Sequence, residues 1–187
     1  NLKKIKVIHF VSGFKDGGVE QMLLNYTKML NKHLPIDNII VYQHPANDRK
    51  KELSEFYGNK MYRIPFKKSH PINNLRMTFN ILKHERPDVV HAHMNLVNFF
   101  PLAVAWFLKI PERITHSHIA EDNVNPILAP FFKQMNMFFA TSLAACGEKA
   151  GLYMYGKNKF KIIYNAIDED KYTFSINNRE KLRKRFH

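Results

Sequence analysis

Apolar and polar positions along the chain follow two alternating patterns. Short apolar runs rich in β-branched residues, such as Ile5–Val11, are typical of buried strands. Apolar residues that recur every three or four positions, as over residues 19–30, are typical of amphipathic helices. Strands are predicted at residues 5–11, 37–43, 60–64, 88–93, 113–118, 143–147 and 160–164. Helices are predicted at residues 19–30, 48–57, 72–82, 96–108, 127–141 and 148–155, with a kink near Pro101.

Strand and helix alternate about seven times, which predicts βαβ units with right-handed crossovers and a mainly parallel sheet. The predicted fold class is α/β, a doubly wound, Rossmann-like domain whose ligands bind beyond the carboxyl ends of the strands. After residue 168 the strand pattern stops, and residues 177–187 form the start of a charged helix. We therefore expect one domain over residues 1–170, and over residues 171–187 a linker and the start of a second domain.

Composition limits the classes of protein that remain. The chain has 187 residues, of which 45% are hydrophobic and 13% aromatic, enough for one well-buried domain. Its single cysteine, Cys146, excludes an intramolecular disulfide and a cysteine-rich metal site. The most apolar stretch, residues 96–108, is interrupted by Asn98 and Pro101, so we expect no membrane-spanning helix, and no signal peptide is visible.

The charge balance favours an anionic partner. Lys and Arg number 29 against 16 Asp and Glu, a formal net charge of +13. Such an excess suits a nucleic acid, an acidic lipid surface or a phosphorylated substrate. The chain has neither zinc-finger spacing nor an RNA-binding signature, so specific nucleic-acid binding is not expected.

A glycine loop follows the first predicted strand. Gly17 and Gly18 stand directly before a predicted helix, whose free N–H groups and dipole favour an anion such as phosphate. The alternative is an ordinary tight turn. The loop matches neither G-x-G-x-x-G nor a Walker P-loop, which argues against a usual NAD-binding domain or P-loop NTPase.

Two pairs of histidines end two predicted strands. His91 and His93 flank Ala92, and His116 and His118 flank Ser117, so each pair shares one strand face. Four imidazoles suggest a metal site, but no acidic or cysteine ligand stands beside them, and hydrogen bonding to a polyol or a phosphate is the preferred interpretation. We expect His91 and His116 to pack inward as hydrogen-bonded core histidines.

Five segments occur in the order found in a known family. They are KVIHFVSGFKDGGVEQ, DVVHAHM, ERITHSHIAEDN, AACGEKAGLYMYG and KIIYNAIDEDKY. Together they resemble the amino-terminal half of retaining GT-B glycosyltransferases of the family 4 type, which includes capsular and exopolysaccharide enzymes. The resemblance implies two Rossmann-like domains that face a cleft. The amino-terminal domain mainly binds the acceptor, and the carboxyl-terminal domain holds the nucleotide-sugar donor.

The resemblance also implies roles for individual residues. His118 matches a family histidine that contacts the transferred sugar near the reacting centre, and it is the expected catalytic residue. The donor phosphates are expected to meet Gly17 and Gly18. The acceptor or sugar site is expected to include Glu20, His93 and Met94.

Some positions depart from the family pattern. Ala166 replaces a glycine in the segment that leads to the interdomain linker, and Gly147 replaces a common serine. The family's second domain carries two glutamates separated by seven residues, and no pair of glutamates in this chain has that spacing. The chain is therefore expected to be the acceptor half, inactive without its donor-binding half. No metal and no cofactor are expected, because the nucleotide sugar is a substrate and cationic side chains can stabilise its diphosphate.

The expected partners are a nucleotide-sugar donor, held with the second domain, and a glycan or lipid-linked acceptor in cell-surface polysaccharide synthesis. The expected location is cytoplasmic, peripheral on the inner face of the cell membrane. A basic, aromatic face could meet anionic lipid. It comprises Arg63, Phe66, Lys67, Lys68, Arg76, Phe79 and Lys83. Two alternatives stay open: a non-catalytic module that binds phosphate or nucleotide, and a nucleic-acid-binding protein driven by charge.

Overall fold

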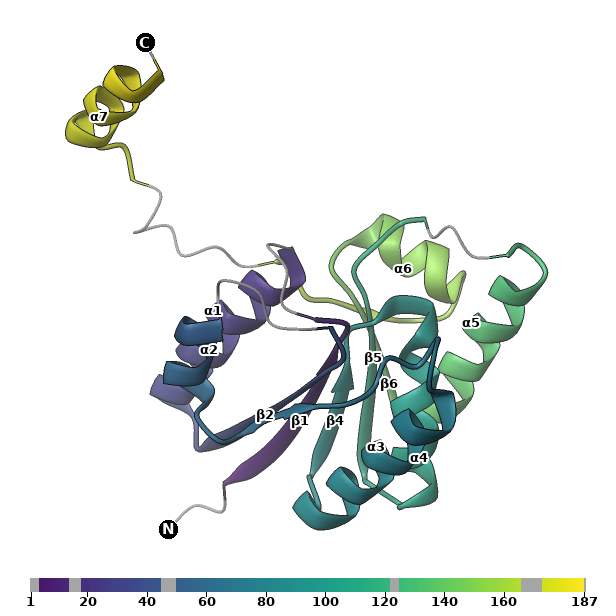
Figure 1. Cartoon of the computed structure of the whole chain (residues 1–187). Coiled ribbons are helices and arrows are strands. Elements are labelled where there is room, and N and C mark those ends of the chain that lie inside the picture. The colour runs from purple at the N-terminus through teal and green to yellow at the C-terminus, as the bar shows by residue number, and fades with distance from the viewer. Residues whose placement is uncertain (1–3, 14–17, 45–49, 122–124, 166–172, 187) are drawn as a thin grey trace.

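The computed structural model describes residues 4–13, 18–44, 50–121, 125–165 and 173–186, apart from the side chains of residues 50–52 and 54. The strands are β1 (Ile5–Val11), β2 (Ile36–Tyr42), β3 (Met61–Arg63), β4 (Val89–Ala92), β5 (Glu112–Ser117), β6 (Ser142–Ala145) and β7 (Lys161–Ile162). The helices are α1 (Gly18–His33), α2 (Lys50–Tyr57), α3 (Pro71–Glu85), α4 (Phe99–Phe107), α5 (Leu128–Phe139), α6 (Glu148–Tyr155) and α7 (Ile176–Phe186), with a 3₁₀ turn, η1 (Asn95–Asn98), before α4. Figure 1 shows this arrangement.

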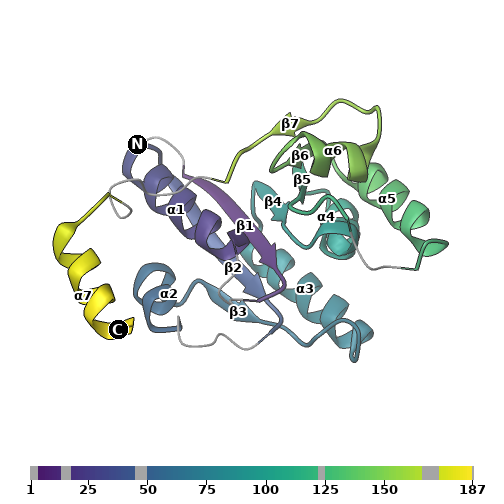
Figure 2. The same ribbon diagram turned by 90° about the horizontal axis from the view of Figure 1, so that it is seen from above.

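The strands form one parallel sheet in the order β3-β2-β1-β4-β5-β6-β7. From β1 the chain builds outward through β2 and β3, then crosses to the other side of β1 and continues with β4. β1 and β4 are therefore the two strands between which the order reverses, where doubly wound sheets bind their ligands. The predicted α/β, Rossmann-like fold class is confirmed, and Figure 2 shows the strands side by side from above.

Helices cover both faces of the sheet (Figure 1). Ile40 and Val11 face α1 and α2 and pack with Leu23, Leu24 and Tyr57. The strand residues next to these, such as Phe10 and Ile39, face α3 and α4. The apolar cluster on that side includes Ile8, Phe10, Ile39, Val90 and, from α4, Leu102. Neighbours along a strand therefore enter opposite layers, as the period of two requires.

Two predicted elements differ from the structure. The predicted helix at 96–108 is divided into η1 and α4, and Pro101 is the third residue of α4. In the first turn of a helix a missing N–H removes no internal hydrogen bond, so proline is tolerated there and no kink results from it. The predicted strand at 160–164 is shorter, because only Lys161 and Ile162 pair with β6.

The last helix, α7, contributes no side chain to the buried core. α7 stands apart from the sheet and its helices in both views, and none of its described side chains is buried. The predicted boundary near residue 170 falls in residues 166–172, outside the described part of the chain. Among the described residues, no helix has the length and apolar character needed to cross a membrane.

Candidate functional site: a histidine cluster at the switch point

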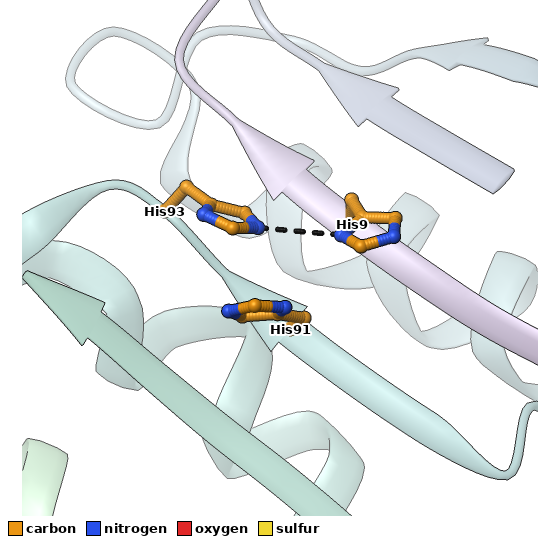
Figure 3. Close-up of side chains that lie close together, drawn as sticks. All are labelled: His9, His91 and His93. Atoms are coloured by element: carbon orange, nitrogen blue, oxygen red, sulfur yellow. Dashed lines mark hydrogen bonds between the residues drawn. The ribbon is translucent and has the colours of Figure 1, made fainter. Parts of the chain in front are cut away.

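Five histidines from three adjacent strands lie against one another. They are His9 of β1, His91 and His93 of β4 and its end, and His116 and His118 of β5 and its end. His9 is directly opposite His91 in the β1–β4 register. The ring centroids are 3.9 Å apart for His91 and His93 and 4.0 Å apart for His116 and His118. Figure 3 shows the first three rings, which project from β1 and β4 toward one another.

Hydrogen bonds connect the rings in two sets. Nδ1 of His93 is 3.0 Å from Nε2 of His118, and Nε2 of His93 is 3.3 Å from Nδ1 of His9. Nε2 of His91 is 3.1 Å from Nδ1 of His116. Two buried ring nitrogens have no hydrogen-bond partner in the described part of the chain, namely Nε2 of His116 and Nδ1 of His118.

Burial keeps these imidazoles neutral. It lowers the pKa of His9 and of His118 to about 4, while hydrogen bonds to the side chains of Asn38 and Asn165, respectively, act to raise the pKa. Burial, with repulsion from neighbouring histidines, lowers the pKa of His116 to about 3. The same causes hold the pKa values of His91 and His93 well below their ordinary value. At neutral pH each ring therefore has one N–H donor and one bare acceptor nitrogen.

The expected division between inward and cleft-facing histidines is correct for His116 and wrong for His91. His116 is fully buried and its Nδ1 bonds to Nε2 of His91, as expected of a hydrogen-bonded core histidine, although its Nε2 has no partner among the described residues. His91 is only half-buried, whereas His93 is 4% exposed. The reason is the strand geometry itself: residues two apart share one face, so the rings of each pair lie against each other instead of pointing to different environments.

Two asparagines attach the turn after β4 to the end of β5. Oδ1 of Asn95 accepts a hydrogen bond from the backbone N–H of His118 at 2.8 Å. Asn95 has a φ of +55°, a conformation that asparagine tolerates better than most residues. Oδ1 of Asn98 accepts from the N–H of Met94, and its Nδ2 donates to the carbonyl of His116 at 3.2 Å. The backbone of both histidine-bearing strands is thus held by side chains that belong to the site.

Met94 and Lys67 lie deeper than the sequence suggested. The Met94 side chain is 6% exposed and packs in the apolar core, and its sulfur accepts a hydrogen bond from Nε2 of Gln43 at 3.0 Å. Nζ of Lys67 is 3.7 Å from the same sulfur, and burial lowers the pKa of Lys67 to about 8. The contact of Met94 with a sugar stays a prediction. Lys67, expected on the lipid-facing surface, instead points toward Met94.

The glycine loop is described only in part. Gly17 lies outside the described residues. Gly18 begins α1, is exposed, and a Cβ added there would have no atom within 4 Å. Glu20 is half-buried in the first turn of α1. The approach of a donor phosphate to this helix start stays a prediction, and the open space at Gly18 leaves room for it.

Two site residues, His9 and Asn38, were not identified from the sequence. His9 and Asn38 are polar residues within the buried parts of β1 and β2, whose other buried residues are apolar, and this is the signal that could have marked them. Gly13 follows β1, and a Cβ added there would lie 2.5 Å from Cβ of His44. Only glycine therefore lets the end of β1 pack against the end of β2.

Two histidine trios could hold a metal ion. Their donor atoms lie within 4.8 Å of one another in His9, His91 and His93, and again in His93, His116 and His118. Neutral imidazoles are suitable ligands for zinc and related ions. Both trios, however, contain nitrogens that already bond to each other, so an ion would have to replace those hydrogen bonds. The arrangement as it stands is better suited to hydrogen bonding with an uncharged, hydroxyl-rich ligand.

The chain is similar to several known proteins over about half of their length. EpsF of Bacillus subtilis (strain 168), whose assigned name is that of a glycosyltransferase, is 26% identical over 182 residues, which covers 90% of this chain and 47% of EpsF. A glycosyltransferase structure from Rickettsia africae matches with a TM-score of 0.66 and 16% identity, covering 98% of this chain and 49% of that one. MurG from Acinetobacter baumannii matches with a TM-score of 0.59 and 13% identity, covering 90% and 47%.

A further solved structure, S. aureus MnaA with UDP, has a TM-score of 0.63 and 16% identity, covering 92% of this chain and 47% of its own. At these identities the structural matches show a shared fold. The sequence profile of the family described as Glycosyltransferase Family 4 matches residues 16–171, which is most of the chain. This range includes α1, the turn with Asn95, and four of the five histidines. The chain therefore belongs to Glycosyltransferase Family 4.

Proposed function

We propose that this chain is the amino-terminal, acceptor-side half of a retaining glycosyltransferase. The whole enzyme would transfer a sugar from a nucleotide-sugar donor to a glycan or lipid-linked acceptor in cell-surface polysaccharide synthesis. One observation carries the proposal: the histidine cluster occupies the carboxyl ends of β4 and β5, beside the point where the strand order reverses. Doubly wound sheets bind ligands there, and neutral imidazoles form hydrogen bonds with sugar hydroxyls.

The family match favours sugar transfer over the other chemistry found among the structural neighbours. Those neighbours include UDP-N-acetylglucosamine 2-epimerases, for example one from Methanocaldococcus jannaschii with a TM-score of 0.59 and 18% identity. The fold alone does not separate a transferase from an epimerase. The family profile, together with the glycosyltransferase name of EpsF, supports the transferase.

We assign the substrates to different parts of the protein. His118, His93 and Glu20 would contact the sugars, and the start of α1 at Gly18 would face the donor diphosphate. The chain covers 47% of EpsF and 49% of the Rickettsia enzyme, so the donor site is assigned to the remaining part of such a protein. No metal or cofactor is needed in this scheme, because the helix N-terminus and cationic side chains stabilise the leaving diphosphate.

The experiment compares three proteins: the full-length enzyme, its His118→Ala variant and the 187-residue chain alone. Each is incubated with a panel of nucleotide sugars and a lipid extract, with and without EDTA. Products are followed by mass spectrometry and their anomeric configuration by NMR. We expect a retained configuration, EDTA-resistant turnover by the full-length enzyme and none by the chain alone. Release of an epimerised nucleotide sugar without transfer, or full activity of the chain alone, would contradict the proposal.

The same proposal places the enzyme at the inner face of the cell membrane. Several large aromatic side chains on α4 and α5 are exposed, including Trp106 (48%), Phe107 (69%) and Phe138 (64%). Phe107 contacts Phe79 of α3, whose ring lies under Nζ of Lys83, so basic and aromatic groups adjoin. Aromatic side chains at a basic surface favour anionic lipid.

Flotation with anionic vesicles should recover the protein, and neutral vesicles provide the control. A double variant, Trp106→Ser with Phe138→Ser, should reduce that recovery.

A further inference from the structure

One line of hydrogen bonds runs from the end of β5 to α1. It starts at His118, passes through His93 to His9, and continues from Nε2 of His9 to Oδ1 of Asn38 at 3.0 Å. Nδ2 of Asn38 then donates to Oδ1 of Asn31 in α1 at 2.8 Å. Among the described residues, every ring nitrogen along this line has a partner except Nδ1 of His118, and the side chain of Asn165 also bonds to the His118 ring. The line therefore ends at His118, the residue proposed to meet the sugar.

The amide at the other end determines where each proton is. The carbonyl oxygen of Asn38 can only accept, so His9 must carry its proton on Nε2. Nδ1 of His9 is then bare and accepts from Nε2–H of His93. By the same argument Nδ1 of His93 accepts from Nε2–H of His118. Because all three rings are neutral, each bond determines the next.

We propose that Asn38 is a positioning residue that acts through His9 and His93 to set the tautomer of His118, so that Nδ1 of His118 is a hydrogen-bond acceptor directed at a sugar hydroxyl. The role of His118 in this inference rests on the proposed function. The inference adds the direction of the contact. A bare nitrogen accepts from a hydroxyl donor and disfavours a phosphate or carboxylate oxygen, which has no hydrogen to give. His118 would thus select the hydroxyl-bearing part of a substrate, while the diphosphate is excluded from this position.

The second histidine pair is an internal control. His91 and His116 bond to each other, and Nε2 of His116 has no partner, so no amide determines their direction. Their rings nevertheless lie directly beside the first set, since His116 stacks on His118 and the ring centroids of His91 and His93 are 3.9 Å apart. A change at Asn38 should therefore alter the tautomer of His118 and leave that of His116 unchanged.

The tautomers are measured by two-bond ¹H–¹⁵N correlation of the ¹⁵N-labelled chain at pH 7.5, which separates protonated from bare ring nitrogens. We expect His9, His93 and His118 all to carry their proton on Nε2. The Asn38→Leu variant removes the acceptor, and we expect it to give a mixture of tautomers at His118. The Asn38→Asp variant keeps an acceptor oxygen at the same place, and we expect it to restore the single tautomer.

A proton on Nδ1 of His118 in the unaltered chain would overturn the proposal, as would an unchanged His118 spectrum in folded Asn38→Leu. If Asn38→Leu does not fold, the unaltered chain and Asn38→Asp still decide the direction. The measurement uses no sugar, so it separates this inference from the proposed function. Absence of transferase activity with the expected tautomers would refute the function and leave the line of hydrogen bonds intact.

Discussion

The two faces of the central sheet use the same strands with opposite chemistry. On β1, Ile8 and Phe10 are at most 1% exposed and enter the apolar cluster beneath α3 and α4. His9 stands between them and points to the other face, where it contacts His93 and Asn38. One face removes apolar area from water, which stabilises the fold. The other face also has an apolar cluster, around Val11 and Ile40, but beside it buries imidazoles that lose hydration and leaves two ring nitrogens without partners among the described residues, which lowers stability and prepares a site.

Acid should act almost entirely on the histidine face. Below pH 6.5 the unfolded chain gains protons on these histidines. The folded chain does not, because burial lowers the pKa of His9 and His118 to about 4 and that of His116 to about 3. The free energy of unfolding therefore falls as the pH drops from about 6.5 toward 4, by about 1.4 kcal/mol per pH unit for each such group. With His91 and His93 included, the loss from pH 7.5 to 5.5 is on the order of 5 kcal/mol.

Urea unfolding at a series of pH values measures this loss. His33→Gln is the matched control, since His33 is exposed at the end of α1 and lies outside the histidine cluster. His116→Phe removes one buried imidazole and should reduce the slope between pH 6.5 and 5.5. A stability that is flat over this range would mean that the rings are hydrated and charged, and the contrast between the two faces would not hold.

Truncation on the apolar face should be the next largest effect. Phe10→Ala removes a buried aromatic ring from the main cluster and is expected to lower the free energy of unfolding by about 3–5 kcal/mol. The neighbouring His9→Ala removes a ring whose burial is already unfavourable, and we expect a cost of about 1–3 kcal/mol, mainly from the unpaired oxygen of Asn38. Equal costs at pH 7.5, measured by urea unfolding, would show that both faces stabilise the fold to the same extent.

The same contrast explains what the sequence could predict. The apolar runs determined β1 to within its observed bounds, and the alternation of strands and helices predicted the parallel sheet, because both signals are local. The histidine pairs at 91–93 and 116–118 were also visible locally. His9 was missed because its partners, Asn38 and His93, are 29 and 84 positions away and meet it only across the sheet. The mutual contact of all five rings depends on strand order and register, which the pattern within one strand does not contain.

Two substitutions on one strand should separate chemistry from stability. In the full-length enzyme, His118→Ala is expected to lower kcat by at least ~10-fold, about 1.4 kcal/mol of transition-state stabilisation. Its melting temperature should change little, since His118 is only half-buried at the end of β5. His116→Ala empties a fully buried position and should lower the melting temperature with a milder loss of kcat. Full turnover in His118→Ala, with loss of turnover in folded His116→Ala, would reverse the two roles.

The smallest expected effect concerns the rim of the histidine face, where α1 begins. A side chain at Gly18 meets no atom within 4 Å and its backbone is outside the left-handed region, so Gly18→Ala and Gly18→Val should both fold with changes in free energy of unfolding below about 1 kcal/mol. A side chain at this helix start would still obstruct a diphosphate that approaches the free N–H groups.

In the full-length enzyme we expect the KM for the nucleotide sugar to rise about threefold to fivefold in Gly18→Val and less in Gly18→Ala. The two variants together identify the cause, because valine is bulkier while alanine is the better helix former. Equal KM values in all three proteins would mean that the donor phosphate does not approach α1, and that the polar chemistry of this face is confined to the histidines.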